Sequence, residues 1–134
     1  MNEVEHPASV SWFARGDVDL RSAEVLLAAG EAFPVVAFHI QQAAEKYLKG
    51  YLLARGWEMR RIHDLELLVQ EAISRYPDFA GFLSPCQRIT EYYLESRYPI
   101  GLATEYAADE LASDIATMRQ LVALIRQKVA STGS

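Results

Sequence analysis

The segment from Val36 to Leu52 most limits what this chain can fold into, because it is apolar over most of its circumference when placed on a helix. Its apolar residues recur at helical spacing: Val36, Ile40, Ala44, Tyr47, Leu48, Tyr51 and Leu52. A helix of this kind is buried by neighbours on several sides. The segment therefore predicts a central helix that starts just after Pro34 and ends at Arg55, before Gly56.

Helical spacing recurs along most of the chain, and the alternation typical of half-buried strands is sustained nowhere. We expect a first helix over Ser9–Ala29. A third helix should run to Arg75 with Asp64 as its N-cap, because a carboxylate oxygen accepts from the first backbone N–H groups. A fourth helix should cover Pro85–Glu95, capped by Ser84.

The last helix has the clearest pattern. Its apolar residues repeat at alternating steps of four and three: Leu111, Ile115, Met118, Val122, Ile125 and Val129. Such a narrow seam is typical of helical bundles. Because short connections join long helices, neighbours should be antiparallel. The sequence predicts an all-α, up-and-down bundle of four to five helices, as one domain over residues 1–134 with its core at about 9–129.

Composition limits location and chemistry. The 134 residues include one cysteine, Cys86, so an internal disulfide and a Cys-rich metal site are excluded, and we expect a buried apolar thiol. No apolar run approaches the roughly 20 residues of a membrane span, and the acidic N-terminus lacks a signal-peptide core. We therefore expect a cytoplasmic protein without membrane contact.

The charge is unevenly distributed. The formal net charge of −5 argues against a generic nucleic-acid coat, because such coats use basic surface to neutralise phosphates. One stretch is nevertheless basic and is opposed only by Glu58: Lys46, Lys49, Arg55, Arg60, Arg61 and His63. Such a patch can receive a phosphate group or an acidic partner. Alternatively it is a solvated helix end, where basic residues favour the helix dipole.

Four polar residues on the central helix form one stripe at spacings of three and four: His39, Gln42, Lys46 and Lys49. An imidazole, an amide and two ammonium groups on one face could hold a nucleotide or a phosphate. The alternative is a seam between subunits, in which the lysine stems cover apolar surface.

A second group, Arg60, Arg61 and His63, precedes Asp64. The arginines could hold phosphate oxygens, and a histidine just ahead of a helix could act as an acid or base. Alternatively Asp64 caps the helix and His63 shares that structural role.

A third group lies in a tyrosine-rich run, where Arg97 could bind an anion and Tyr98 could stack on a base. Alternatively Arg97 pairs with a buried carboxylate and fixes the loop. The histidines have no spacing suited to a metal pair, and glycine-rich phosphate loops and zinc-hydrolase motifs are missing. The sequence therefore predicts neither a metal site nor a cofactor.

Several segments in combination resemble the HEPN domain (higher eukaryotes and prokaryotes nucleotide-binding). They are Phe38–Lys49 with its Gln-Gln-Ala-Ala-Glu-Lys core, His63–Leu65, Glu95–Pro99, and an opening helix with Trp12 and Asp19–Glu24. The resemblance implies a four- or five-helix bundle that is commonly a homodimer. It also implies similarity to small proteins encoded beside minimal nucleotidyltransferases, with which they form toxin–antitoxin-like pairs. Many members are metal-independent ribonucleases that use an arginine followed after four to six residues by a histidine.

The chain departs from that ribonuclease pattern. No histidine follows Arg97, Arg55 lies eight positions before His63, and Arg60 and Arg61 lie too near it. The preferred hypothesis is a binding module associated with a nucleotide or RNA that works with a minimal nucleotidyltransferase. One alternative is a metal-independent ribonuclease toxin with a divergent site, for which His63 and Arg97 are the candidate catalytic residues. Another alternative is a purely structural dimer.

Overall fold

The computed structural model describes residues 7–92 and 106–130, and nearly all of these residues are helical. Within these ranges five α-helices and one 3₁₀ helix follow one another: α1 (Pro7–Ala29), α2 (Phe33–Ala54), α3 (Leu65–Arg75), η1 (Pro77–Phe82), α4 (Leu83–Ile89) and α6 (Ala108–Ala130). The described residues contain no strand. The predicted all-α, up-and-down bundle of four to five helices is confirmed.

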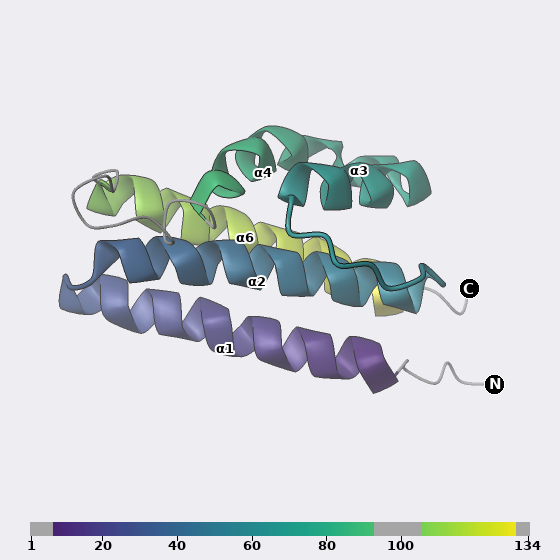
Figure 1. Cartoon of the computed structure of the whole chain (residues 1–134), viewed down its shortest axis with the longest axis horizontal. Coiled ribbons are helices and arrows are strands. Elements are labelled where there is room, and N and C mark those ends of the chain that lie inside the picture. The colour runs from purple at the N-terminus through teal and green to yellow at the C-terminus, as the bar shows by residue number, and fades with distance from the viewer. Residues whose placement is uncertain (1–6, 93–105, 131–134) are drawn as a thin grey trace.

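Helix α2 lies at the centre of the bundle, as its apolar circumference predicts (Figure 1). α1 covers one side of it, α3 and α4 lie over the opposite side, and α6 packs behind (Figure 1). The connection between α1 and α2 is short because Gly30 and Ala32 both adopt left-handed backbone conformations, with φ of 72° and 53°. This turn makes α1 and α2 antiparallel neighbours along their whole length.

Two glycines bring α1 and α2 close together. A Cβ atom at Gly16 would lie 3.1 Å from the ring of Tyr47, and one at Gly50 would lie 2.6 Å from the ring of Phe13. Each helix therefore accommodates an aromatic ring of the other where it lacks a side chain. Gly16 weakens α1 as an isolated helix by about 1 kcal/mol relative to alanine, but here it makes room for packing.

Helix α6 packs along both α1 and α2. Leu111, Ile115, Met118 and Ile125 of its predicted seam are buried, and Val122 and Val129 are partly buried. Two ion pairs join α6 to α1 in antiparallel order, Arg126 with Asp17 and Arg119 with Glu24. The seam predicted from sequence is therefore the inner face of α6.

The helix bounds agree with the sequence except at the fourth helix. Asp64 caps α3 as predicted, accepting a hydrogen bond of 2.9 Å from the backbone N–H of Glu66. The prediction of a helix over Pro85–Glu95 capped by Ser84 is wrong, because α4 begins at Leu83 and ends at Ile89. η1 runs directly into α4, where the N–H of Leu83 donates to the carbonyl of Ala80, and α4 begins without a side-chain cap. Glu95 lies outside the described residues.

Cys86 is fully buried, and this burial raises the pKa of its thiol to about 12. It therefore packs as a small apolar residue, as predicted. None of the described helices combines the length and the hydropathy that crossing a membrane requires.

Substituting Gly50→Ala tests the close contact of α1 and α2. The added methyl group would overlap the ring of Phe13, and overpacking of this kind costs about 1–3 kcal/mol, which exceeds the helix-propensity gain of roughly 1 kcal/mol. We expect a net loss of about 1 kcal/mol in the free energy of unfolding, measured with urea. Gly81→Ala is the matched control, because nothing lies within 4 Å of its Cβ position. Equal stability of the two variants would contradict the proposed contact.

Candidate functional site

The polar stripe on α2 faces another helix of the same chain. Asp19 of α1 is buried between them and pairs with two members of the stripe. Its carboxylate lies 2.8 Å from Nδ1 of His39 and accepts a short hydrogen bond from Nζ of Lys46. His39 and Lys46 retain only 26% and 18% side-chain exposure. These residues therefore join α1 to α2, and the seam that they line is internal to the chain rather than open to a ligand.

A second buried carboxylate, Glu45, organises the other half of the stripe. It pairs with Lys49 one turn away at 2.8 Å, and both side chains are about 5–6% exposed. Its oxygens also lie 3.0 and 3.2 Å from Nδ1 of His63, and Gln41 donates to it at 3.2 Å. A buried ion pair persists only when its remaining hydrogen-bonding positions are satisfied, and His63 and Gln41 supply that here. Gln42, the remaining stripe residue, donates to Gln41 at 2.7 Å.

The Glu45 cluster fixes the connection between α2 and α3. This segment returns along α2, as the teal coil in Figure 1 shows. Gln41 donates to the backbone carbonyl of His63 at 3.2 Å, and the carboxylate of Glu45 contacts the imidazole. The His63 side chain remains 50% exposed. The buried charges of α2 thereby hold one histidine at the surface in a defined position.

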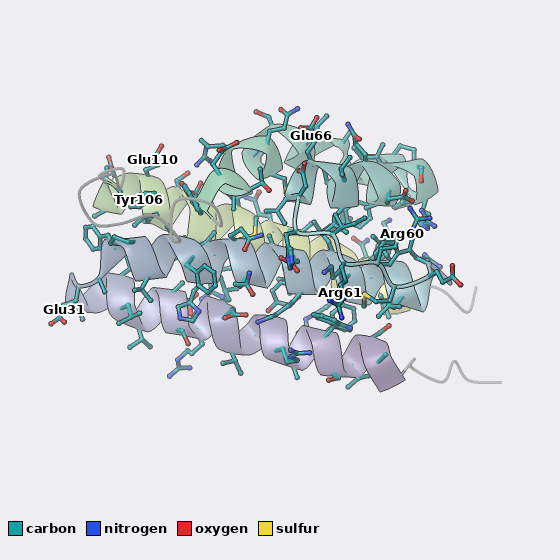
Figure 2. All side chains as sticks on the ribbon, in the orientation of Figure 1. Glu31, Arg60, Arg61, Glu66, Tyr106 and Glu110 are labelled. Atoms are coloured by element: carbon teal, nitrogen blue, oxygen red, sulfur yellow. The ribbon has the colours of Figure 1, made fainter. Side chains whose placement is uncertain are left out.

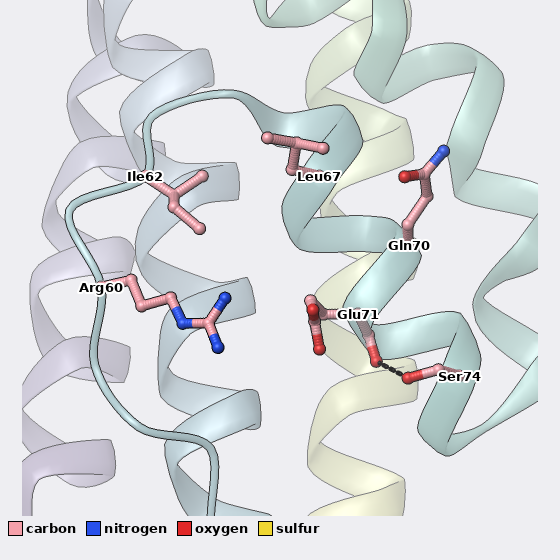
Figure 3. Close-up of a pocket in the computed structure, with 6 residues that line it drawn as sticks. All are labelled: Arg60, Ile62, Leu67, Gln70, Glu71 and Ser74. Carbon is pink, nitrogen blue, oxygen red and sulfur yellow. Dashed lines mark hydrogen bonds between the residues drawn. The ribbon is translucent and has the colours of Figure 1, made fainter.

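Arg60 and Arg61 lie just before this histidine and are both exposed. Neither forms an ion pair with any residue of the described segments. They point to different sides of the connection, Arg61 toward α1 and Arg60 toward α3 (Figures 2 and 3). The two guanidinium groups therefore do not converge on a single phosphate, and a ligand that contacts both must extend across the connection.

A shallow pocket of about 220 Å³ separates the connection from α3. Arg60 and Ile62 line one wall, and the opposite wall is formed by residues of α3: Leu67, Gln70, Glu71 and Ser74. Figure 3 shows the guanidinium group of Arg60 directed across the pocket toward Glu71. The pocket thus offers one cation beside amide, hydroxyl and apolar groups, and also one carboxylate.

Arg97 and Tyr98 lie outside the described residues, so neither of the alternatives for them is tested. A buried carboxylate does occur near the start of α6, where the side chain of Asp114 is 1% exposed. The guanidinium group of Arg88 in α4 donates hydrogen bonds of 2.6 and 3.0 Å to its two carboxylate oxygens. The hydroxyl of Tyr92 donates a third, of 2.6 Å. The hydrogen bond to Asp114 raises the pKa of Arg88, and burial followed by this carboxylate raises the pKa of Tyr92.

Sequence reasoning missed the three buried acids, Asp19, Glu45 and Asp114, although their spacing carried a signal. Asp114 follows Leu111 by three residues and precedes Met118 by four, so it lies in the apolar phase of its helix. Glu45 lies between apolar residues and one turn before Lys49. An acidic residue on the apolar face of a helix predicts that a polar or charged partner is buried beside it. Which residue that partner is depends on which helix packs against this face.

The described residues contain no group of three or more His, Cys, Asp or Glu side chains that could hold a metal ion. The exposed polar side chains of the connection include the guanidinium groups of Arg60 and Arg61, the imidazole that Glu45 contacts, and the carboxylates of Glu58 and Asp64. Cations placed by a rigid scaffold attract and position anions.

Comparisons with known proteins agree with this fold. The family model for the HEPN domain matches residues 9–128. A solved structure of TT1696 from Thermus thermophilus superposes with a TM-score of 0.73 over 90% of this chain and 97% of that one. At 24% sequence identity, this likeness concerns the fold alone. No curated protein matches the sequence.

Substituting Asp114→Asn tests the buried cluster at the start of α6. The change keeps the shape of the side chain but removes the charge that Arg88 and the buried Tyr92 hydroxyl hold. We expect a loss of about 2–3 kcal/mol in the free energy of unfolding, because the amide lacks the charge that pairs with Arg88 and its NH2 group replaces one of the two oxygens that accept from Arg88 and Tyr92. Asp109→Asn is the control, since Asp109 is exposed in the first turn of the same helix. A loss at Asp114 no larger than that at Asp109 would contradict the structural role of the cluster.

Proposed function

Because this chain belongs to the HEPN domain family, we propose that it is a non-catalytic binding module for RNA or a nucleotide that works with a minimal nucleotidyltransferase in a toxin–antitoxin-like pair. The observation that carries the proposal is the basic connection between α2 and α3, which presents Arg60 and Arg61 without ion-pair partners among the described residues. In a chain of net charge −5, two exposed guanidinium groups on one connection, without ion-pair partners among the described residues, can attract an anion.

The placement of the acid–base groups supports binding over catalysis. His39 is held by Asp19 and His63 by Glu45, and Lys46 and Lys49 neutralise the same two carboxylates. Groups paired in this way are part of the packing of α1, α2 and the connection, since removing one partner would leave a buried charge uncompensated. The arginine–histidine spacing of the family's ribonucleases is also absent from the sequence.

The divergence of Arg60 and Arg61 favours a ligand with several phosphates over one with a single phosphate (Figures 2 and 3). A single-stranded RNA offers successive phosphates along an extended backbone, and basic side chains that follow this backbone bind it without reading its sequence. The pocket beside Arg60 adds amide and hydroxyl groups from Gln70 and Ser74 that can contact a ribose or base.

The proposal includes two protein partners that the family resemblance implies, a second copy of this chain and a minimal nucleotidyltransferase. The acidic balance of the chain away from the connection leaves the basic surface distinct from the rest of the molecule. A nucleotidyltransferase binds a nucleoside triphosphate. A module beside it that carries phosphate-binding groups would contact the same nucleotide or RNA.

Arg60→Ala and Arg61→Ala test the RNA-binding surface. Each variant should weaken binding of a fluorescent single-stranded RNA about fivefold at 0.1 M salt and reduce the salt slope by about 0.7, because one phosphate contact is lost. Fluorescence anisotropy titrations at several salt concentrations measure both quantities. Arg119→Ala, an exposed arginine on α6, is the matched control and should bind as the unaltered protein does.

The same mixtures test the alternative of a divergent ribonuclease. In the presence of a chelator, the RNA should stay intact through the titration on a denaturing gel. Cleavage that His63→Ala abolishes would replace the binding proposal with the ribonuclease alternative. Absence of RNA binding in the unaltered protein, with no thermal shift from nucleotides, would leave only a structural role.

Co-expression with a minimal nucleotidyltransferase encoded beside this gene tests the partner. We expect the two proteins to co-purify through affinity capture and gel filtration, since the proposed pair acts as a complex. An unrelated nucleotidyltransferase expressed in the same way is the control. Failure to co-purify under conditions in which both proteins are folded would exclude this partner.

A further inference from the structure

The two walls of the pocket beside Arg60 carry opposite charges. The guanidinium group of Arg60 lines one wall and the carboxylate of Glu71 lines the other, and the guanidinium points across the opening toward the carboxylate (Figure 3). The two groups do not form an ion pair, since no described residue pairs with Arg60. A space of about 220 Å³ therefore separates an exposed cation from a carboxylate.

Glu71 has acceptor capacity that the described residues leave unused. Its Oε1 accepts from Nη1 of Arg75 at 2.9 Å, one turn further along α3, and its side chain is 38% exposed. No described residue donates to its Oε2. The two oxygens of a carboxylate offer about four acceptor positions, so a ligand at this wall must bring hydrogen-bond donors. A phosphate group would be repelled there.

We propose that this pocket takes a guanine nucleotide of the bound RNA, with its phosphate at Arg60 and its base at Glu71. The inference rests on the proposed function for the phosphate contact and adds a preference for one base. Guanine presents two adjacent donors, N1–H and the N2 amino group, and one carboxylate can accept from both. Adenine and cytosine have a ring-nitrogen acceptor in place of N1–H, and the single N3–H of uracil lies between two carbonyl oxygens.

The other groups of the pocket suit the same base. Gln70 carries an amide on the α3 wall, and an amide N–H can donate to the O6 carbonyl that neighbours N1 in guanine. Ile62 and Leu67 offer apolar surface to the plane of the base, and Leu67 is 49% exposed in the absence of a ligand. A base lying against Leu67 would remove this apolar surface from water.

Three short fluorescent oligouridine strands that differ at one central nucleotide test the base preference. We expect the strand with guanosine to bind about tenfold more tightly than the strand with adenosine, because a good pair of hydrogen bonds to a base discriminates by at least roughly this factor. The strand with inosine, which lacks only the N2 amino group, should bind with intermediate affinity. Fluorescence anisotropy titrations of the full chain measure all three.

Glu71→Gln tests the residue that contacts the base. The change keeps the length of the side chain but replaces one acceptor oxygen by an NH2 donor. The preference for guanosine should fall below about twofold, and the salt slope should stay unchanged because no phosphate contact is lost. Glu58→Gln is the matched control, since it removes an exposed carboxylate from the connection outside the pocket and should retain the preference.

Free guanosine monophosphate carries the same base and phosphate as the strand, so competition distinguishes the two sources. It should displace the guanosine strand at about tenfold lower concentration than adenosine monophosphate does. The strand should bind more tightly than the free nucleotide, because its further phosphates can reach Arg61. A free nucleotide that binds as tightly as the strand would overturn RNA as the source of the base.

Equal binding of the guanosine and adenosine strands would overturn the inference and leave the proposed function intact, since that function is measured by affinity and salt slope. A preference for guanosine that Glu71→Gln leaves unchanged would also overturn it, because the base would then be bound elsewhere. Absence of binding to every strand would instead remove the proposed function, and the inference with it.

Discussion

The burial of α2 on nearly every side is the constraint on which the rest of the structure depends. A helix in that position cannot leave a charge without a partner, because an uncompensated charge in the interior is strongly destabilising. Glu45 and Lys49 are both buried on α2, and their pair is completed by Gln41 and by His63 from the following connection. The need to satisfy one buried carboxylate thus determines where the connection lies, and with it the basic surface of the molecule.

The same principle explains how the helices are joined. α1 contributes Asp19 to His39 and Lys46 of α2, and α6 contributes Asp114 to Arg88 and Tyr92. Apolar packing supplies most of the stabilisation but is not directional, whereas these paired charges specify which residues of two helices lie side by side. The glycines that admit aromatic rings between α1 and α2 contribute a further positional constraint. The apolar core therefore stabilises the bundle, and a few buried polar contacts determine how its helices are aligned along one another.

The proposed function rests on the groups left outside those contacts. His39, Lys46 and Lys49 of the α2 stripe are residue types that can bind a phosphate, but in the fold they pair with the buried Asp19 and Glu45. Arg60 and Arg61 instead remain exposed on a connection that the buried network holds in place. Only side chains that remain exposed after the helices have packed can contact other molecules.

The sequence by itself determined the helices and the family. Periodicity along one helix is local, so the central position of α2, the seam of α6 and the Asp64 cap were all predictable. The start of α4 was not, because the 3₁₀ helix before it supplies a carbonyl acceptor, that of Ala80, to the N–H of Leu83, and the chain enters α4 without a side-chain cap. Nor were the partners of His39, Lys46 and His63, since they come from residues 18 to 27 positions away in the chain. Only the tertiary structure decides such pairings, because they depend on the rotation and the close approach of whole helices.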